Sequence, residues 1–314
     1  MNSCALGSTT ASGRRSPGSN PALMLLHPGI KVNLGLDILR KRPDGYHDIE
    51  TLFVPCDDFH DTLEIVPADE PSQLVFDWLR NHPAQASGSV PDAPVLRQEI
   101  SADGKVMMSV FRQEGVHWDP MKDLCVKAYR LLEADFSLPA VKIALEKGSP
   151  VGAGLGGGSA DAACALRVFN ELFSLGLSDP DLDAYAARLG SDCPVFVYNR
   201  PMLGRGRGEV LTPFPMEDFF RRYYIKVYVP EGISVSTAQA YAGVTPVVPD
   251  TSLAQRLAEP VARWKDILVN AFEPGIVRRY PQLADLKARI YADGALYAAM
   301  SGSGSAFFGV FERR

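Results

Sequence analysis

A run of glycines near the middle of the chain is the stretch whose residue types most directly suggest chemistry. Five of the seven residues from Gly152 to Gly158 are glycine, and the segment 147–160 holds one cation and no carboxylate. The pattern predicts a strand over 140–145 and a helix over 159–173. Because free N–H groups at a helix N-terminus attract anions, the arrangement predicts a phosphate-binding loop. A flexible surface linker is the alternative, but linkers mix glycine with serine and proline and rarely run into an apolar-periodic helix.

Known phosphate loops narrow the choice. No Lys-Ser or Lys-Thr follows the last glycine, which excludes a Walker A loop. Gly152, Gly154 and Gly157 fit the dinucleotide pattern G-x-G-x-x-G, so an NAD-dependent oxidoreductase is the alternative of another class. That alternative predicts a strand with an acidic end near residue 180. The segment 182–189 instead has a helical pattern, with Ser178 before it as an N-cap and Gly190 after it as a stop.

Polar residues at three other places are candidates for chemistry. Lys31 and Asn33 share one face of a strand predicted over 27–36. Tyr46 and His47 follow a Pro-Asp-Gly turn at 43–45. Asp192 is predicted in a turn between a helix and a buried strand that begins near Val195. Taken alone, such a lysine is usually a solvated edge residue, such a histidine an exposed turn residue, and such an aspartate a partner in a local turn hydrogen bond.

The motifs together carry a resemblance to a known family. The string Pro150-Val-Gly-Ala-Gly-Leu-Gly-Gly-Gly-Ser-Ala160 resembles the phosphate loop of the galactokinase, homoserine kinase, mevalonate kinase and phosphomevalonate kinase (GHMP) superfamily. Lys31-Val-Asn-Leu34 and the glycine turn within 299–309 resemble its first and third motifs. Asp44-Gly-Tyr-His47 narrows the resemblance to the 4-diphosphocytidyl-2-C-methyl-D-erythritol kinases. The segments 190–197, 204–209 and 230–241 also resemble that family, and the resemblance runs from Ala22 to the C-terminus.

The resemblance implies an ATP-dependent kinase acting on a small-molecule CDP-linked sugar alcohol. Phosphoryl transfer requires charge neutralisation, positioning and removal of the hydroxyl proton. Asp192 is the expected general base, with Lys31 beside it to keep the carboxylate ionised and to stabilise the developing charge. Their charged groups are therefore predicted within about one hydrogen-bond length or one bridging water. Mg²⁺ is required by the chemistry, and Ser159 is a possible ligand from the wider superfamily, although no protein ligand is certain.

The remaining site residues are also implied by the resemblance. For the acceptor, it assigns Tyr46 and Tyr241 as ring partners of cytosine and His47 to the edge of the base, with Asn33 and Thr237 nearby. In place of the asparagine that this family commonly has near the nucleotide, the chain has Asp123, which puts that contact in doubt. For ATP, it assigns Lys147, Pro150, Val151, Gly152, Ala153, Gly154, Leu155, Gly156, Gly157, Gly158, Ser159 and Ala160.

The implied fold is a two-domain α/β (α+β) GHMP kinase fold. A ribosomal protein S5 domain 2-like N-terminal domain is expected over 21–213 and a ferredoxin-like C-terminal domain over 214–314, with the catalytic cleft between them. Residues 1–20 have the composition of a disordered tail. The segment 81–91 reads as a loop and 95–111 as a hairpin turned at Asp103-Gly104, and no chemistry is assigned to 78–120. Helical patterns are expected over 253–272 and 282–293.

Composition limits the other possibilities. The chain of 314 residues has a net charge of -5, which argues against a nucleic-acid or polybasic membrane role. No apolar run is long enough to cross a bilayer. Five widely spaced cysteines form no C-x-x-C pair, so reduced thiols in a cytoplasmic protein are expected.

Two alternatives within the superfamily stay open. A sister kinase acting on a mevalonate derivative or homoserine is opposed by the Asp44–His47 segment. A non-catalytic member would usually lack the Lys31 and Asp192 pair. The sequence does not indicate the oligomeric state.

Overall fold

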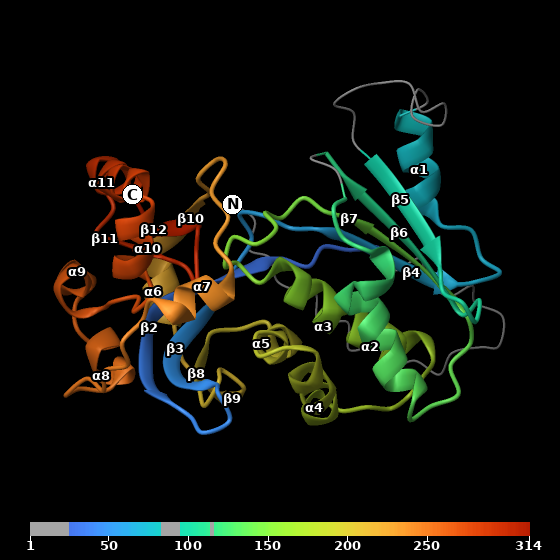
Figure 1. The fold of residues 1–314 in the computed structure, drawn as a ribbon, viewed down its shortest axis with the longest axis horizontal. Coiled ribbons are helices and arrows are strands. Elements are labelled where there is room, and N and C mark those ends of the chain that lie inside the picture. The colour runs from blue at the N-terminus through green and yellow to red at the C-terminus, as the bar shows by residue number, and fades with distance from the viewer. Residues whose placement is uncertain (1–24, 83–94, 114–115) are drawn as a thin grey trace.

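The fold was established from a computed structural model, which describes residues 25–82, 95–113 and 116–314. The described strands form three sheets of five, four and three strands. Figure 1 shows the five-stranded sheet and its helices on one side of the molecule and the C-terminal elements on the other. The predicted tail over 1–20 and most of the loop predicted over 81–91 lie outside the described residues.

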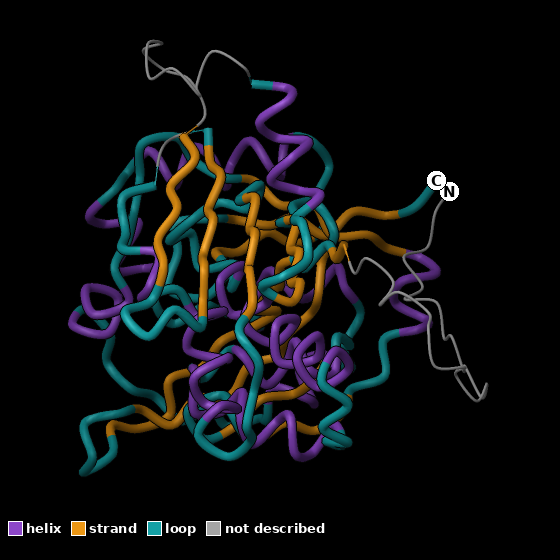
Figure 2. Tube along the Cα trace, turned by 90° about the vertical axis from the view of Figure 1, so that its right-hand side faces the viewer, coloured by secondary structure: helices purple, strands orange, loops and turns teal. Residues whose placement is uncertain are grey.

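The five-stranded sheet has the order β1-β4-β7-β6-β5, and its strands run side by side in Figure 2. Only β6 and β7 pair in parallel. The predicted hairpin over 95–111 is confirmed as β5 and β6. The bounds are β1 Leu25–Leu26, β4 Thr62–Pro67, β5 Val95–Ile100, β6 Val106–Arg112 and β7 Val141–Glu146.

Alternation along these strands decides which helices cover which face. Val110 and Leu145 belong to the largest apolar core, against α2 (Leu124–Glu133), α3 (Gly157–Leu172) and α4 (Asp179–Leu189). Their neighbours Phe111 and Ala144 point to the opposite face and pack with Trp78 of α1 (Gln73–Asn81). A short 3₁₀ turn, η2 (Pro120–Lys122), precedes α2.

The strand predicted after Asp192 is wrong, because this segment is the helix α5 (Cys193–Tyr198). Pro194 occupies the first turn, where its missing N–H costs nothing, and Asn199 ends the helix in the left-handed conformation. The β-branched residues that suggested a strand are buried against α3 and α4, and this packing overrides their strand preference. The helix predicted over 182–189 is confirmed, with Ser178 in a capping box and Gly190 at its end.

The four-stranded sheet supplies the first motif. Its order is β2-β3-β8-β9, with bounds Ile30–Lys41, His47–Cys56, Met202–Arg205 and Val210–Pro213. Nine consecutive residues of β2, from Ile30 to Ile38, are buried. A strand buried on both faces packs against both parts of the molecule. β2 therefore connects the two sides seen in Figure 1.

The C-terminal sheet has the order β10-β12-β11, all antiparallel. The helix expected over 253–272 is wrong in part, because Pro260 interrupts it and only short helical turns form. The helix predicted over 282–293 is confirmed. The bounds are α6 Glu217–Arg222, β10 Tyr223–Tyr228, α7 Thr237–Ala242, α8 Leu253–Leu257, η3 Val261–Arg263, α9 Trp264–Ile267, α10 Glu273–Arg279, α11 Gln282–Ala292, β11 Tyr297–Met300 and β12 Phe307–Glu312.

One apolar core joins segments from both ends of the chain. Val32 and Leu52 pack in the same cluster as Trp264 and Phe308. The predicted boundary at residues 213 and 214 stays a prediction. Among the described residues, no helix is long and apolar enough to cross a membrane.

Candidate active site

The glycine-rich segment forms a tight loop that leads into α3. Gly152, Gly154 and Gly156 have φ values of 74°, 80° and 75°, which side chains rarely adopt. Gly156 is the N-cap of α3, and the first turn of that helix contains no acidic residue. The 16-residue helix therefore presents free N–H groups and the positive end of its dipole to the loop, which favours a bound anion.

The predicted pairing of Lys31 with Asp192 is confirmed. Lys31 Nζ lies 3.1 Å from Asp192 Oδ2. The lysine is 2% exposed and the aspartate 38%, so one member of the pair is fixed in the protein and the other faces the cavity. Asp192 occupies the N-cap of α5, but its side chain makes no capping hydrogen bond. The carboxylate is therefore directed to Lys31 instead of to its own helix.

Hydrogen bonds fix the Lys31 ammonium from two further directions. Its Nζ donates to Asn33 Oδ1 at 2.7 Å and to the Gly154 carbonyl at 2.9 Å. Asn33 Nδ2 donates in turn to Thr51 Oγ1 at 3.1 Å, and Ser301 Oγ donates to the Gly154 carbonyl at 3.2 Å. This network joins the first strand, the glycine loop and the third motif around a single buried charge.

A second lysine is held behind the loop. Lys147 Nζ bonds Asp161 Oδ2 at 2.7 Å and also bonds Asp61, whose carboxylate accepts from Ser149 N at 2.7 Å. Burial lowers the pKa of Lys147, but the charges of Asp161 and Asp61 outweigh it and raise that pKa above its ordinary value. Burial raises the pKa of Asp161 well above its usual range. The cluster fixes the residues that follow β7 to the second turn of α3.

Two cavities meet at the glycine loop. The larger, of about 550 Å³, is lined by Lys31, Asp192 and residues of α7. The smaller, of about 320 Å³, is lined by Trp118, Asp123, Lys147 and the whole loop. Gly152, Gly154, Gly156 and Ser159 line both cavities. The loop is therefore a shared wall between a space suited to a nucleotide and a space suited to an acceptor.

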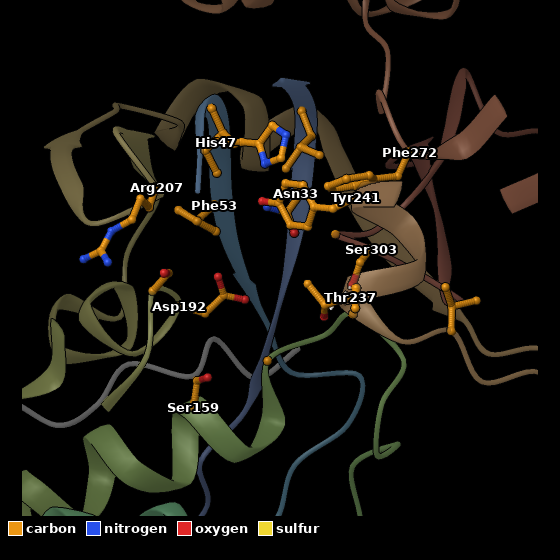
Figure 3. Close-up of a pocket in the computed structure, with 18 of the residues that line it drawn as sticks. Asn33, His47, Phe53, Ser159, Asp192, Arg207, Thr237, Tyr241, Phe272 and Ser303 are labelled. Atoms are coloured by element: carbon orange, nitrogen blue, oxygen red, sulfur yellow. Dashed lines mark hydrogen bonds between the residues drawn. The ribbon is translucent and has the colours of Figure 1, made fainter. Parts of the chain in front are cut away.

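The residues predicted for the acceptor all line the larger cavity. The His47 ring stacks on Tyr241, with centroids 4.7 Å apart and planes 25° apart. Thr237 Oγ1 lies 3.3 Å from Ser303 Oγ. Tyr46 is 54% exposed, and the Arg207 guanidinium lies over its ring, with Cζ 4.9 Å from the ring centroid. Figure 3 shows Thr237, Tyr241 and Ser303 on one wall of this cavity and Asp192 and Arg207 on the other.

The residues predicted for ATP lie together, with one exception. Lys147 and residues 150–159 all line the smaller cavity, whereas Ala160 does not. Ala160 is 3% exposed and lines a separate cavity with other residues of α3 and α5. Asp123 caps α2 by accepting from Cys125 N at 2.9 Å, as an asparagine can also do. The carboxylate is therefore compatible with its position beside the smaller cavity.

Several residues at the site were not identified from the sequence. Arg207 lies in a glycine-rich turn that the sequence indicates only as a connection between two strands. Asp161 follows Ser159 by two residues. Its position on the predicted helix indicates that its side chain is buried but suggests no role at the site. The others are Asp61 and Trp118, which lie outside the motifs, and Ser191 and Ser303, which lie within motif segments that assign them no role.

The described residues contain no group of three or more His, Cys, Asp or Glu side chains that could hold a metal ion. Mg²⁺ commonly takes one or two protein ligands and completes its shell with phosphate and water. Ser159, which lines both cavities, supplies a hydroxyl where a phosphate would lie. The Ser159 hydroxyl therefore fits a Mg²⁺ ion whose other ligands come mainly from the nucleotide and from water.

Comparison with known proteins shows the family to which the chain is similar. The model of the GHMP kinases N terminal domain matches residues 123–200, and that of the GHMP kinases C terminal matches residues 253–314. A 4-diphosphocytidyl-2-C-methyl-D-erythritol kinase of Bacteroides thetaiotaomicron is 38% identical over 289 residues, 92% of each chain. One of Bacteroides fragilis is 40% identical over 290 residues, again 92% of each chain.

Solved structures give the same result. A crystal structure of 4-(cytidine 5'-diphospho)-2C-methyl-D-erythritol kinase has a TM-score of 0.67 and 31% identity, covering 91% of this chain and 89% of its own. A homoserine kinase from Cytophaga hutchinsonii, at 15% identity and a TM-score of 0.59 over 91% of this chain and 84% of its own, shares the fold. The expected GHMP kinase fold is thus confirmed, and the helix α4 stands where the NAD alternative requires a strand. The chain belongs to the 4-diphosphocytidyl-2-C-methyl-D-erythritol kinase family of the GHMP kinases.

Proposed function

We propose that the protein transfers the γ-phosphoryl group of ATP to the 2-hydroxyl of 4-diphosphocytidyl-2-C-methyl-D-erythritol, in the non-mevalonate route to isoprenoid precursors. The observation that carries this proposal is the Lys31–Asp192 pair, 3.1 Å apart in the cavity that adjoins the phosphate loop. Family membership supplies the identity of the acceptor. The four described cysteines are free thiols, which supports the expected cytoplasmic location.

The smaller cavity is the proposed ATP site. Backbone N–H groups of the loop and of the first turn of α3 bind the phosphates, and no acidic side chain of that turn opposes them. The Trp118 ring and Asp123 line the same space, where an adenine ring fits beside an aromatic face. Lys147 is already paired with two carboxylates, so its part is to hold the loop in place.

Asp192 is the proposed general base. It accepts the proton of the acceptor hydroxyl as the oxygen attacks the γ-phosphorus. Lys31 cannot turn away, because Asn33 and Gly154 fix its ammonium. Its positive charge therefore faces the oxygen on which negative charge develops, without reorganisation during the reaction.

The cytidine end is proposed to bind at the far end of the larger cavity. Tyr241, Tyr46 and His47 offer ring faces and a ring nitrogen for a pyrimidine. Burial and the charge of Asp192 raise the pKa of Tyr241, so its hydroxyl stays a neutral donor. Asn33 and Thr237 complete the acceptor site near the reacting hydroxyl.

Mg²⁺, when bound with ATP, neutralises charge on the transferred phosphoryl group. We propose the Ser159 hydroxyl as its protein contact. This serine lies at the start of α3 and lines both cavities.

The decisive experiment is an ATP-coupled assay with the cytidine-linked acceptor on the wild-type protein, Asp192→Asn and Lys31→Met. Loss of a general base costs on the order of 10²–10⁴-fold in kcat, and loss of one transition-state donor costs about 10²–10³-fold. Both variants should still bind ATP, because neither side chain lines the smaller cavity. Asp192→Asn with nearly wild-type kcat would remove Asp192 from its role.

Sister activities are tested in the same assay. Homoserine and mevalonate derivatives have no cytosine ring, so they leave the wall formed by His47 and Tyr241 without a partner. We expect cytidine nucleotides to compete with the acceptor in the wild-type protein. Turnover of homoserine or phosphomevalonate in place of the cytidine-linked acceptor would assign the protein to a sister activity.

A further inference from the structure

Resting on the proposed function, we infer that Arg207 binds the diphosphate of the cytidine-linked acceptor and thereby selects a nucleoside diphosphate over an uncharged cytidine. The acceptor brings a diphosphate into the larger cavity between its base and its sugar alcohol. Among the described residues that line this cavity, the Lys and Arg side chains are Lys31 and Arg207. These two side chains are therefore the candidate Lys or Arg contacts for a dianionic group there.

Lys31 is already fully engaged. Its ammonium, 2% exposed, bonds Asn33, Gly154 and Asp192 at 2.7, 2.9 and 3.1 Å. Each of the three N–H donors of the Lys31 ammonium therefore has an acceptor, and the Asp192 carboxylate balances its positive charge. The diphosphate cannot take this lysine without disrupting the catalytic pair.

Contacts with neighbouring residues hold the Arg207 side chain in place and leave N–H donors of its guanidinium unused. Its Nε lies 3.3 Å from Glu209 Oε1, and its guanidinium packs over the Tyr46 ring at 4.9 Å. Among the described residues, neither of its terminal nitrogens has a hydrogen-bond partner. Two N–H groups of a planar guanidinium match two phosphate oxygens, and the contact with Tyr46 fixes the plane in advance. The side chain is 34% exposed, as an entrance residue must be.

The location also suits the middle of the acceptor. Arg207 stands on the same wall as Asp192, opposite Tyr241 (Figure 3). Its aromatic partner Tyr46 adjoins His47, which stacks on Tyr241. Arg207 therefore lines the cavity beside Tyr46, a proposed cytosine contact, on the wall that also holds Asp192. The glycines on either side of Arg207 have φ values of 67° and 115°, so the turn brings this side chain to the cavity.

The chain provides a matched control close to Arg207. Arg205, two residues earlier, is 51% exposed, pairs with Glu50 at 2.9 Å, and does not line the cavity. Arg205→Gln therefore removes the same charge from the end of the adjoining strand β8, outside the site. Arg207→Lys keeps the charge but loses the planar fork.

The test measures KM for both substrates, together with inhibition by CDP and by cytidine, in the wild-type protein and in Arg207→Gln, Arg207→Lys and Arg205→Gln. Charge-assisted hydrogen bonds correspond to about tenfold to a hundredfold in affinity. In Arg207→Gln, the KM of the acceptor and the inhibition constant of CDP should both rise by such a factor. The ATP KM, kcat and the inhibition constant of cytidine should change less than about threefold. Arg207→Lys should recover part of the loss, and Arg205→Gln should behave as the wild type.

Three results would overturn the inference. Equal weakening of CDP and cytidine would mean that Arg207 acts by supporting the Tyr46 ring. Unchanged CDP inhibition in Arg207→Gln would place the diphosphate elsewhere while leaving the kinase activity intact. Absence of acceptor turnover in the wild-type protein would remove the proposed function and this inference together, and it is recognised before any variant is compared.

Discussion

At the scale of single residues, the catalytic charges depend on backbone that tolerates no side chain. A Cβ at Gly154 would overlap the Ser301 carbonyl oxygen and approach Gly304 N at 2.9 Å. The carbonyl of Gly154 also accepts from Lys31 and from Ser301. This glycine therefore serves the phosphate loop and the catalytic lysine at once.

Gly154→Ala should raise the KM for ATP at least about tenfold and lower kcat, because the loop must shift and release Lys31. The left-handed conformation alone costs an alanine about 1–2 kcal/mol. Gly176→Ala is the control, since Gly176 has a φ of 71° and a Cβ there meets nothing within 4 Å. Steady-state kinetics and urea unfolding of both variants check this, and equal kinetic effects would contradict it.

Residue identities were predictable where a motif fixes them. Lys31, Asn33 and Asp192 were identified by their motif context. The proximity of Lys31 and Asp192, 161 positions apart and 3.1 Å from each other, followed only from the roles that the family resemblance implies. Arg207 was missed because a glycine-rich turn is compatible with any surface connection. The loop string contains Ala160 and so predicts it at the ATP site. A residue in the first turn of a helix can, however, point away from the loop, and Ala160 lines a separate cavity.

At the scale of elements, charged side chains attach α2 to the hairpin turn between β5 and β6. Arg130 of α2 bonds Asp103 at 2.7 Å and Glu133 at 2.6 Å, and Lys105 of the turn lies 2.5 Å from Glu133. The Arg130 hydrogen bond lowers the pKa of Asp103 below its usual range. Burial raises the pKa of Glu133, but bonds to Lys105 and Arg130 outweigh it and lower that pKa overall.

These lowered pKa values predict an acid-sensitive contribution to stability. A carboxyl with a depressed folded-state pKa stabilises the protein above its unfolded-state pKa, here the ordinary value of 4.5 for Glu133. That stabilisation is lost as the pH falls through the folded-state pKa. Glu133→Gln should lower the free energy of unfolding at pH 7 by about 0.5–1 kcal/mol.

The same variant should show a smaller further loss than the wild type between pH 5 and pH 3. Urea unfolding across that range measures the difference. Parallel pH curves for the two proteins would show that Glu133 does not contribute through its charge.

Element types were predictable where periodicity and caps agree. The helix 179–189 had both a period and boundary residues, and the helix 282–292 had a period. The segment after Asp192 had valines and a phenylalanine without a period, and burial against α3 and α4 decided its conformation. The segment 253–272 had helical spacing, but Pro260 interrupts it.

At the scale of the whole molecule, a buried ion pair joins the first strand to the C-terminal part. Asp37 of β2, 3% exposed, pairs with Arg256 of α8, which is 9% exposed. Arg256 Nη1 lies 3.3 Å from the Ile267 carbonyl, while its Nε is buried without a partner in the described part of the chain. Removing the carboxylate would leave the guanidinium buried and uncompensated.

Asp37→Ala should therefore lower the free energy of unfolding by about 3–5 kcal/mol. Asp218→Ala, which breaks an ion pair whose members are 77% and 89% exposed, should cost no more than about 1 kcal/mol. A similar cost for both variants would show that burial does not set the energy of these pairs.

The two cavities separated by the glycine loop have a consequence for the order of events during turnover. Each cavity has its own lining beyond the shared glycines and Ser159, so neither substrate has to pass through the other's space. Either substrate can then arrive first, and either product can leave first. Isotope exchange at chemical equilibrium tests this, in both the ATP–ADP pair and the acceptor pair. Exchange in each pair should persist when the other pair is saturating, and suppression of either would reveal a compulsory sequence of arrival.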